Sequence, residues 1–164
     1  MNIVLCGMMG CGKTSVAEEL EKLGHITVDT DALIVERYGE INKIFDERGE
    51  QYFREIEAQT VAEVAEKYND AVISLGGGCV LRAQNVKNLK ESGKIFYLRA
   101  KCETLEERLK GDITRPLLRG NLKERINTVL SAREKIYAAA ADFTIDTDGL
   151  TPRQIAMAIR EKIL

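Results

Sequence analysis

A glycine-rich segment near the start of the chain constrains the possible folds more than any other feature. The segment GMMGCGKT at positions 7–14 follows the β-rich run 3–6 and matches the G-x-x-x-x-G-K-[ST] spacing. Its glycines let the backbone turn tightly around phosphate groups, its lysine places an ammonium on the outer phosphates, and its threonine hydroxyl can bind Mg²⁺. The sequence therefore predicts a nucleoside triphosphate site made by Gly10, Cys11, Gly12, Lys13, Thr14 and Ser15.

Short β-rich runs alternate with longer stretches of helical periodicity along the chain. Between positions 53 and 68, for example, apolar side chains recur at the spacing of one helix face. Such alternation is typical of stacked βαβ units, in which helices cover both faces of a buried parallel sheet. We therefore expect an α/β sandwich with strands at 3–6, 26–28, 71–75, 94–98 and 142–145.

The length and charge of the chain limit its organisation and its partners. It has 164 residues, 45% of them hydrophobic, and no linker-like segment, so we expect a single domain covering 1–164. Its 24 basic and 26 acidic residues give a net charge of -2. Because this balance provides no general field for nucleic acid or an anionic membrane, an anionic ligand must be bound by locally placed cations.

The cysteine pattern indicates a reducing compartment. Cys6, Cys11, Cys79 and Cys102 lack the spacing of a zinc site or a redox dithiol, and His25 is the single histidine. The first residues do not resemble a secretory leader, and no stretch approaches the roughly 18 apolar residues of a membrane span. We therefore expect a soluble cytoplasmic protein.

Two acidic residues follow the second predicted strand, at Asp29 and Asp31. Ligands of such folds bind at the carboxyl ends of the strands, where one carboxylate can take a proton from a hydroxyl while another helps to hold Mg²⁺ through water. Helix capping is the simpler interpretation, since Thr30 or Asp31 could cap a helix over 32–38. The two roles are compatible.

Two arginines are candidates for binding an anion. Arg54 precedes Glu57 by three residues, and an exposed pair on a helix surface is the simplest interpretation of that spacing. Arg133 is more informative because it shares a helix face with apolar residues such as Val129 and Tyr137. An arginine on a core face needs a partner, either a protein carboxylate or an anionic substrate bound by both guanidinium nitrogens.

Two glycine-containing segments lie where ligands or moving parts are expected. Gly76, Gly77 and Gly78 end the third strand and can leave backbone N–H groups open to a ligand, although a flexible turn is the alternative. The segment 111–120 has glycines at both ends and Arg115 within it, as a mobile lid would, and a solvated loop is the alternative there.

Taken together, these residues resemble the shikimate kinase family, a group of small P-loop kinases. The resemblance covers nearly the whole chain and rests on the order and spacing of several motifs. They are the glycine-rich segment, Asp29-Thr30-Asp31, Gly49-Glu50 with Phe53-Arg54 and Glu57, Gly76-Gly77-Gly78, Arg115-Pro116-Leu117-Leu118, Arg133 with Tyr137, and Ala141-Asp142.

The resemblance implies a fold and a reaction. The fold is a three-layer αβα sandwich with a five-stranded parallel sheet of order 2-3-1-4-5, in a protein that acts as a monomer. The reaction is the ATP-dependent phosphorylation of the 3-hydroxyl of shikimate, with Mg²⁺, on the route to chorismate and the aromatic amino acids. The region 31–60 would bind shikimate, and 111–121 would form the lid.

The resemblance also implies roles for individual residues. Lys13 and Arg115 would stabilise the transferred phosphoryl group, and Asp31 would be the base. Thr14 would ligate Mg²⁺ and Asp29 would assist the metal through water. The shikimate-binding residues would be Asp31, Arg54, Gly76, Gly77, Gly78 and Arg133, and the adenine would lie between Arg108 and a loop over 145–152 that includes Pro152.

The sequence departs from the family pattern at two places. Cys11 stands where a small inert residue is usual, and a thiol at a helix N-terminus can have a lowered pKa, so its oxidation or alkylation would block ATP. The stretch 39–41 is slightly short, which affects local loop geometry.

Two alternatives remain open at the level of the sequence. Gluconate kinases and nucleoside monophosphate kinases share the fold, although two arginines with Asp31 favour a carboxylated polyol as acceptor. The second alternative is a guanine-nucleotide switch protein. The segments that resemble its motifs are in the wrong order, however, and Phe45 stands in place of the aspartate that selects guanine.

Overall fold

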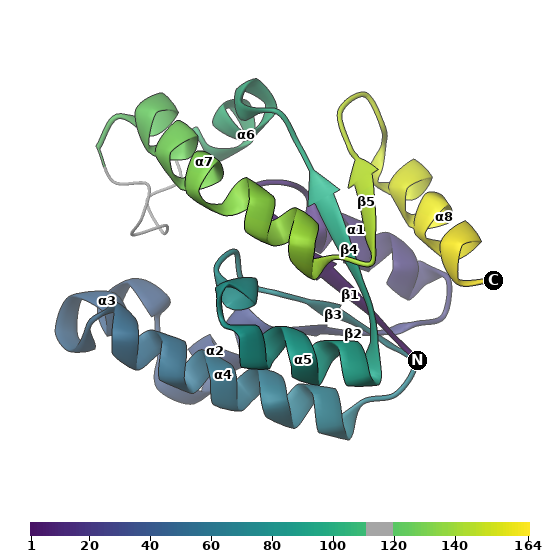
Figure 1. The fold of residues 1–164 in the computed structure, drawn as a ribbon, viewed down its shortest axis with the longest axis horizontal. Coiled ribbons are helices and arrows are strands. Elements are labelled where there is room, and N and C mark those ends of the chain that lie inside the picture. Colours follow the sequence, from purple (N-terminus) through teal and green to yellow (C-terminus); the bar gives the residue numbers. More distant parts are fainter. Residues whose placement is uncertain (111–119) are drawn as a thin grey trace.

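The computed structural model describes residues 1–110 and 120–164. Strands and helices alternate along the chain (Figure 1). The elements are β1 (Asn2–Cys6), α1 (Lys13–Lys22), β2 (Ile26–Asp29), α2 (Thr30–Tyr38), α3 (Ile41–Arg48), α4 (Glu50–Lys67), β3 (Ala71–Ser74), the 3-10 helix η1 (Cys79–Leu81), α5 (Ala83–Ser92), β4 (Gly93–Arg99), α6 (Cys102–Leu109), α7 (Leu122–Ala140), β5 (Phe143–Asp146) and α8 (Pro152–Ile163).

The strands form one parallel sheet in the order β2-β3-β1-β4-β5, which confirms the expected topology. Each strand lies where the sequence predicts it, and the boundaries differ by a single residue at most. The register places Asp29 opposite Ser74 and Cys6 opposite Tyr97. The loops after β1, β2 and β3 therefore begin at the same edge of the sheet.

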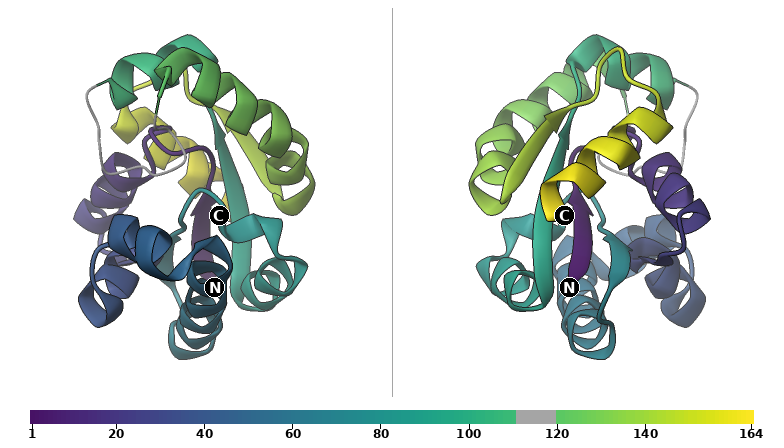
Figure 2. Two further views of the ribbon diagram at one scale, coloured as in Figure 1. Left: turned by 90° about the vertical axis from the view of Figure 1, so that its left-hand side faces the viewer. Right: turned by 90° about the vertical axis from the view of Figure 1, so that its right-hand side faces the viewer.

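Helices cover both faces of the sheet, so the molecule has three layers. Helices α1 and α8 pack together on one face, and α4, α5 and α7 lie on the other (Figure 2). The central strands are apolar on both sides, and Leu5, Ile73 and Phe96 are fully buried between the layers. Burial on both faces explains why these strands appear in the sequence as continuous apolar runs without polar alternation.

Helices α2, α3 and α4 form a small apolar cluster of their own beyond the sheet. Its buried members are Ile34, Ile44, Phe53 and Ile56. The chain turns between these helices at Gly39 and Gly49, whose φ angles of 92° and 86° lie in the left-handed region that favours glycine. Helix α3 lies between the helical stretches 32–38 and 53–68 that the sequence indicated, in a segment to which the sequence assigned no separate helix.

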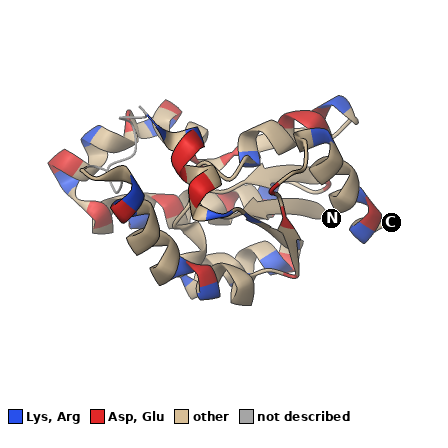
Figure 3. Ribbon diagram, turned by 90° about the horizontal axis from the view of Figure 1, so that it is seen from above, with Lys and Arg blue, Asp and Glu red and all other residues tan. Residues whose placement is uncertain are grey.

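Charged residues of both signs are interspersed over the helices (Figure 3). This distribution agrees with the balanced composition of the sequence, and the cations that bind an anion must be sought within the site. Within the described ranges, no helix combines the length and apolar character required to cross a membrane.

Candidate active site

The loop between β1 and α1 has the backbone shape of a phosphate cradle. Gly7, Gly10 and Gly12 have φ angles of 146°, 82° and 101°, so three turns of the loop use conformations that favour glycine. A Cβ atom on Gly7 would lie 2.7 Å from the carbonyl oxygen of Leu98. The loop leads directly into α1, whose N-terminal N–H groups and dipole favour an anion.

Two cations lie against this loop. Lys13 Nζ donates hydrogen bonds to the carbonyl oxygens of Gly7 and Met8, at 2.8 and 3.2 Å. Arg108 Nη1, from α6, donates to the carbonyl oxygen of Gly10 at 3.1 Å. Both groups therefore lie where phosphate oxygens could replace these carbonyl acceptors. The sequence predicts such a role for Lys13, whereas the resemblance implies that Arg108 stacks on the adenine.

The thiol of Cys11 is fully buried beneath the loop, 3.6 Å from Lys13 Nζ. Oxidation or alkylation of this thiol would therefore require the loop to open, because a reagent does not reach a fully buried thiol directly. Burial also raises the pKa of Cys6 to about 12, despite the opposing charge of Lys13. Cys6 therefore stays protonated and unreactive.

The phosphate loop faces a cleft of about 300 Å³ at the carboxyl edge of the sheet. Most of the predicted nucleotide and metal residues line this cleft, together with Asp31 and two of the three glycines after β3. The lining residues are Met9, Gly10, Gly12, Lys13, Thr14, Ser15, Asp29, Asp31, Ser74, Leu75, Gly76, Gly77 and Arg108.

The end of β2 holds the two acidic residues in different ways. Asp29 caps α2, because its Oδ1 accepts a hydrogen bond from the backbone N–H of Ala32 at 2.9 Å. The predicted cap, Thr30 or Asp31, is therefore wrong. Thr30 is buried, and its hydroxyl accepts from the backbone N–H of Gly76 at 3.3 Å, which joins the ends of β2 and β3. Asp31 is left to face the cleft.

Side chains from three helices converge on the glycines after β3. A Cβ atom on Gly76 would lie 2.5 Å from Asp31 Oδ1, and one on Gly78 would lie 2.6 Å from Arg54 Cζ. At Gly77 the nearest such atom would be Arg133 Nη1, at 3.4 Å. None of the three glycines has a positive φ, so they make room for side chains where the sequence suggested a flexible turn as an alternative.

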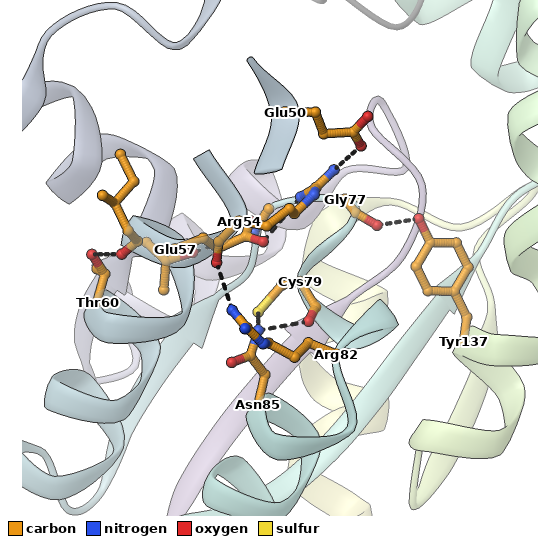
Figure 4. A network of polar contacts seen from close by, with 12 residues as sticks. Glu50, Arg54, Glu57, Thr60, Gly77, Cys79, Arg82, Asn85 and Tyr137 are labelled. Carbon is orange, nitrogen blue, oxygen red and sulfur yellow. Dashed lines mark hydrogen bonds and ion pairs between the residues drawn. The ribbon is translucent and has the colours of Figure 1, made fainter. Parts of the chain in front are cut away.

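Arg54 is fixed by two glutamates on its own helix. Its Nη1 lies 2.9 Å from Glu57 Oε1, and its Nη2 lies 3.4 Å from Glu50 Oε1 (Figure 4). Glu57 is only 1% exposed, so the simple interpretation of an exposed helix pair is wrong. Burial raises the pKa of Glu57, and the charge of Arg54 opposes that rise. The pair therefore presents a partly buried guanidinium beside Gly78.

Arg133 lies on the buried face of α7, as its position in the apolar pattern predicts, and is 6% exposed. Its Nη1 is buried and has no hydrogen-bond partner in the described part of the chain. Since a buried charged donor without an acceptor is costly, this nitrogen is suited to receive an anionic ligand beside Gly77. The sequence left open whether a protein carboxylate or a substrate is the partner.

Further polar contacts hold the glycine loop, and the sequence carried no signal for them. The Tyr137 hydroxyl donates to the carbonyl oxygen of Gly77, and Asn85 Nδ2 donates to that of Cys79 at 2.9 Å (Figure 4). Arg82 Nη1 donates to the main-chain oxygen of Arg54 at 3.2 Å. Tyr137 and Gly77 are sixty residues apart, and Arg82 and Arg54 are twenty-eight apart, so these two contacts could be found only in the folded chain.

The predicted adenine side is only partly assembled in the cleft. Pro152 begins α8 and does not line the cleft. The loop before it is nevertheless tied to α6, because the Asp148 carboxylate accepts from Lys101 N at 3.0 Å and from Thr104 Oγ1 at 2.5 Å. The same helix carries Arg108 near its other end, so the loop and Arg108 are held together.

Three further residues predicted for the site are Arg54, Gly78 and Arg115, of which the first two do not line the phosphate cleft. Arg54 and Gly78 line a neighbouring cavity of about 480 Å³ between α4 and α5, apart from the phosphate cleft. Arg115 and nearly all of the lid expected over 111–121 lie outside the described residues. The role of Arg115 therefore stays a prediction.

Comparisons with known proteins agree with this geometry. Residues 9–164 match the family model described as shikimate kinase. A shikimate kinase of Thermodesulfovibrio yellowstonii is 47% identical over 161 residues, covering 96% of this chain and 92% of the relative. One from Moorella thermoacetica is 44% identical over 164 residues, covering 99% of this chain and 94% of the relative.

Solved structures show the same arrangement. A structure of shikimate kinase from Acinetobacter baumannii in complex with shikimate superposes with a TM-score of 0.94 at 34% identity, covering 99% of this chain and 92% of that one. The YorR protein of Bacillus subtilis, in complex with phosphorylated GDP, is 16% identical with a TM-score of 0.67 and shares the fold alone. The match over nearly the full length shows that this chain belongs to the shikimate kinase family, whose enzymes transfer a phosphate group from ATP to a hydroxyl of shikimate.

Proposed function

We propose that the cleft binds ATP at the loop after β1 and shikimate at the glycines after β3, and transfers the γ-phosphate of ATP to the 3-hydroxyl of shikimate. The observation that carries this proposal is the buried Nη1 of Arg133, which has no partner among the described residues. It lies beside Gly77, which lines the same cleft as Lys13. A phosphate cradle and an unpartnered guanidinium nitrogen beside one cleft suit a phosphoryl acceptor that carries a carboxylate.

At the nucleotide end, the loop backbone and the N-terminus of α1 would surround the phosphates. Lys13 would exchange its carbonyl acceptors on Gly7 and Met8 for phosphate oxygens and offset the charge of the transferred group. Arg108 would exchange the Gly10 carbonyl in the same way while its guanidinium plane covers the adenine.

At the acceptor end, Arg54 beside Gly78 and Arg133 beside Gly77 would bind the carboxylate of shikimate from two helices. The carboxylate of Asp31, which faces the cleft, would hold the ring hydroxyls and take the proton of the reacting hydroxyl. The transition state of phosphoryl transfer is loose, so positioning and charge should contribute more to the rate than this base.

The cleft also offers a fitting site for Mg²⁺. Thr14 and Asp29 both line it beside Lys13, and the described residues contain no cluster of three or more metal-binding side chains. Mg²⁺ commonly takes few protein ligands and completes its shell with water and phosphate oxygens. When bound, the ion would neutralise charge on the phosphates, while Thr14 ligates it and Asp29 orients one of its waters.

An acceptor-specificity assay tests the proposal. ADP release by the purified chain with ATP and Mg²⁺ is measured in the presence of shikimate, gluconate or AMP. We expect ADP release with shikimate only, and formation of shikimate 3-phosphate shown by mass spectrometry. Turnover of gluconate or AMP without turnover of shikimate would reject the assignment of the acceptor.

We also propose that the chain acts as a single-domain monomer in the cytoplasm. All four cysteines, which lie in the described part of the chain, are free, and this state is typical of a reducing compartment. Light scattering during size-exclusion chromatography tests the oligomeric state, with an expected mass near the 18.3 kDa of one chain.

A further inference from the structure

Tyr137 joins the helix that carries Arg133 to the glycine loop that faces the acceptor. It follows Arg133 by one helical turn on the buried face of α7. Its hydroxyl donates a hydrogen bond to the carbonyl oxygen of Gly77, sixty residues away in the sequence (Figure 4). Arg133 and Gly77, which the proposed function assigns to substrate binding, are therefore connected through a residue that has no assigned role.

We propose that Tyr137 is a positioning residue for the acceptor substrate, because its hydroxyl holds the peptide between Gly77 and Gly78 in a fixed orientation against the Arg133 guanidinium. This inference rests on the proposed function, which places the carboxylate of the acceptor at these groups. Tyr137 does not itself touch the substrate in this scheme.

The planarity of the peptide bond explains how the contact acts. The carbonyl of Gly77 and the N–H of Gly78 belong to one planar trans peptide, so they point in opposite directions. Holding the carbonyl toward α7 therefore directs the N–H of Gly78 away from α7. Glycine is the residue with the greatest backbone freedom, so a peptide between two glycines gains the most from such an anchor.

The rest of the loop is held by different partners. The N–H of Cys79 donates to the carbonyl oxygen of Gly76 at 3.2 Å, and that of Leu81 donates to Gly78 at 3.1 Å. The carbonyl oxygen of Cys79 accepts from Asn85, at 2.9 Å. The hydroxyl of Tyr137 supplies the contact from the side of α7, which is the side of Arg133.

The surroundings of Tyr137 keep its hydroxyl a donor. The residue is fully buried, and its ring centroid lies 5.1 Å from that of Tyr97 on β4. Burial raises the pKa of Tyr137 to about 12, although the nearby Arg133 opposes this rise. The hydroxyl therefore stays protonated throughout the pH range of an enzyme assay.

Tyr137→Phe tests the inference, with Tyr97→Phe as the matched control. Both substitutions remove one hydroxyl from a buried ring, and the two rings pack against each other, but only Tyr137 bonds to Gly77. In Tyr137→Phe we expect the KM for shikimate to rise about tenfold, since a hydrogen bond and its buried acceptor are worth about 1.4 kcal/mol. The KM for ATP and the kcat should stay close to those of the unsubstituted protein, and Tyr97→Phe should change none of the three.

Amide hydrogen exchange in the ligand-free protein provides a second measurement, independent of the reaction. Exchange at Cys79 and Leu81, whose N–H groups donate to the carbonyl oxygens of Gly76 and Gly78 within the loop, should be faster in Tyr137→Phe and unchanged in Tyr97→Phe. Unchanged exchange and an unchanged KM for shikimate in Tyr137→Phe would overturn the inference. A fall in kcat together with equal rises in the KM for shikimate and the KM for ATP would also overturn it, because such changes indicate general destabilisation. If the unsubstituted protein does not phosphorylate shikimate, the proposed function fails, while the exchange experiment still decides whether Tyr137 anchors the loop.

Discussion

The two ends of the cleft are built in different ways. The proposed nucleotide end consists mainly of one contiguous segment, from Gly7 to Ser15, and would bind through its backbone and one lysine. The proposed acceptor end is assembled from α2, the loop after β3, α4 and α7, each of which would supply one or two groups. A contiguous site depends on local backbone conformation, whereas an assembled site depends on every contact that holds its separate elements in place.

Lys13→Met should have the largest effect and should be confined to the nucleotide end. Removing a charge that stabilises the transferred phosphoryl group is expected to lower kcat by about 100- to 1,000-fold. Shikimate binding, measured by calorimetry, should be nearly unchanged because the hydrogen bonds that Lys13 makes to described residues all stay within its own loop. Lys22→Met on the same helix removes only an exposed pair with Glu19 and should keep full activity. Loss of shikimate binding in Lys13→Met would show that the two ends are not separate.

Arg133→Met should have the next largest effect, at the acceptor end. Loss of charged hydrogen bonds to the carboxylate is expected to raise the KM for shikimate by about 10- to 100-fold, with little change in the KM for ATP. Because Nη1 is buried without a partner among the described residues, the substitution should not lower the melting temperature of the ligand-free protein. A lower melting temperature with an unchanged KM would mean that Arg133 serves the fold and not the substrate.

Gly78→Ala should show how closely the Arg54 guanidinium packs against the glycine loop at the acceptor end. The new Cβ would lie 2.6 Å from Arg54 Cζ and should displace the guanidinium more readily than the backbone. We expect about a fivefold rise in the KM for shikimate, equivalent to about 1 kcal/mol. Gly77→Ala is the matched control, since its nearest contacts would be 3.4 Å or more away, and its effect should be smaller. The reverse order of the two effects would contradict the arrangement of Arg54 over Gly78.

The pH dependence of stability should give the smallest effect. Burial raises the pKa of Glu57, so the folded state holds this proton more tightly than the unfolded state does. The stabilisation that this bound proton gives to the folded state is therefore complete below the ordinary pKa of 4.5. It is lost as the pH rises through the pKa of Glu57 in the folded protein. Urea unfolding should show that the stability of the unsubstituted protein, relative to Glu57→Gln, falls as the pH rises above the ordinary carboxyl pKa of 4.5. A rise over this range would mean that the charge of Arg54 outweighs burial.

The sequence predicted the strands well because their burial on both faces leaves continuous apolar runs. Arg133 was also recognisable, since a charged residue in an apolar helical pattern must have a partner. The burial of Glu57 could not be recognised from the sequence, because an i,i+3 pair has the same spacing on an exposed helix face as on a buried one. The capping of α2 was misassigned by one or two residues, because Asp29, Thr30 and Asp31 are all suitable capping residues.

By itself, the sequence determined the phosphate loop and the alternation of strands and helices, since both depend on residues adjacent in the chain. It also showed, by resemblance, the family to which the chain belongs. Only the tertiary structure decided that the three glycines after β3 make room for Asp31, Arg54 and Arg133, and that Tyr137 reaches Gly77 from α7. The physical reason is that these contacts join residues distant in the sequence, which meet only when the helices pack on the sheet.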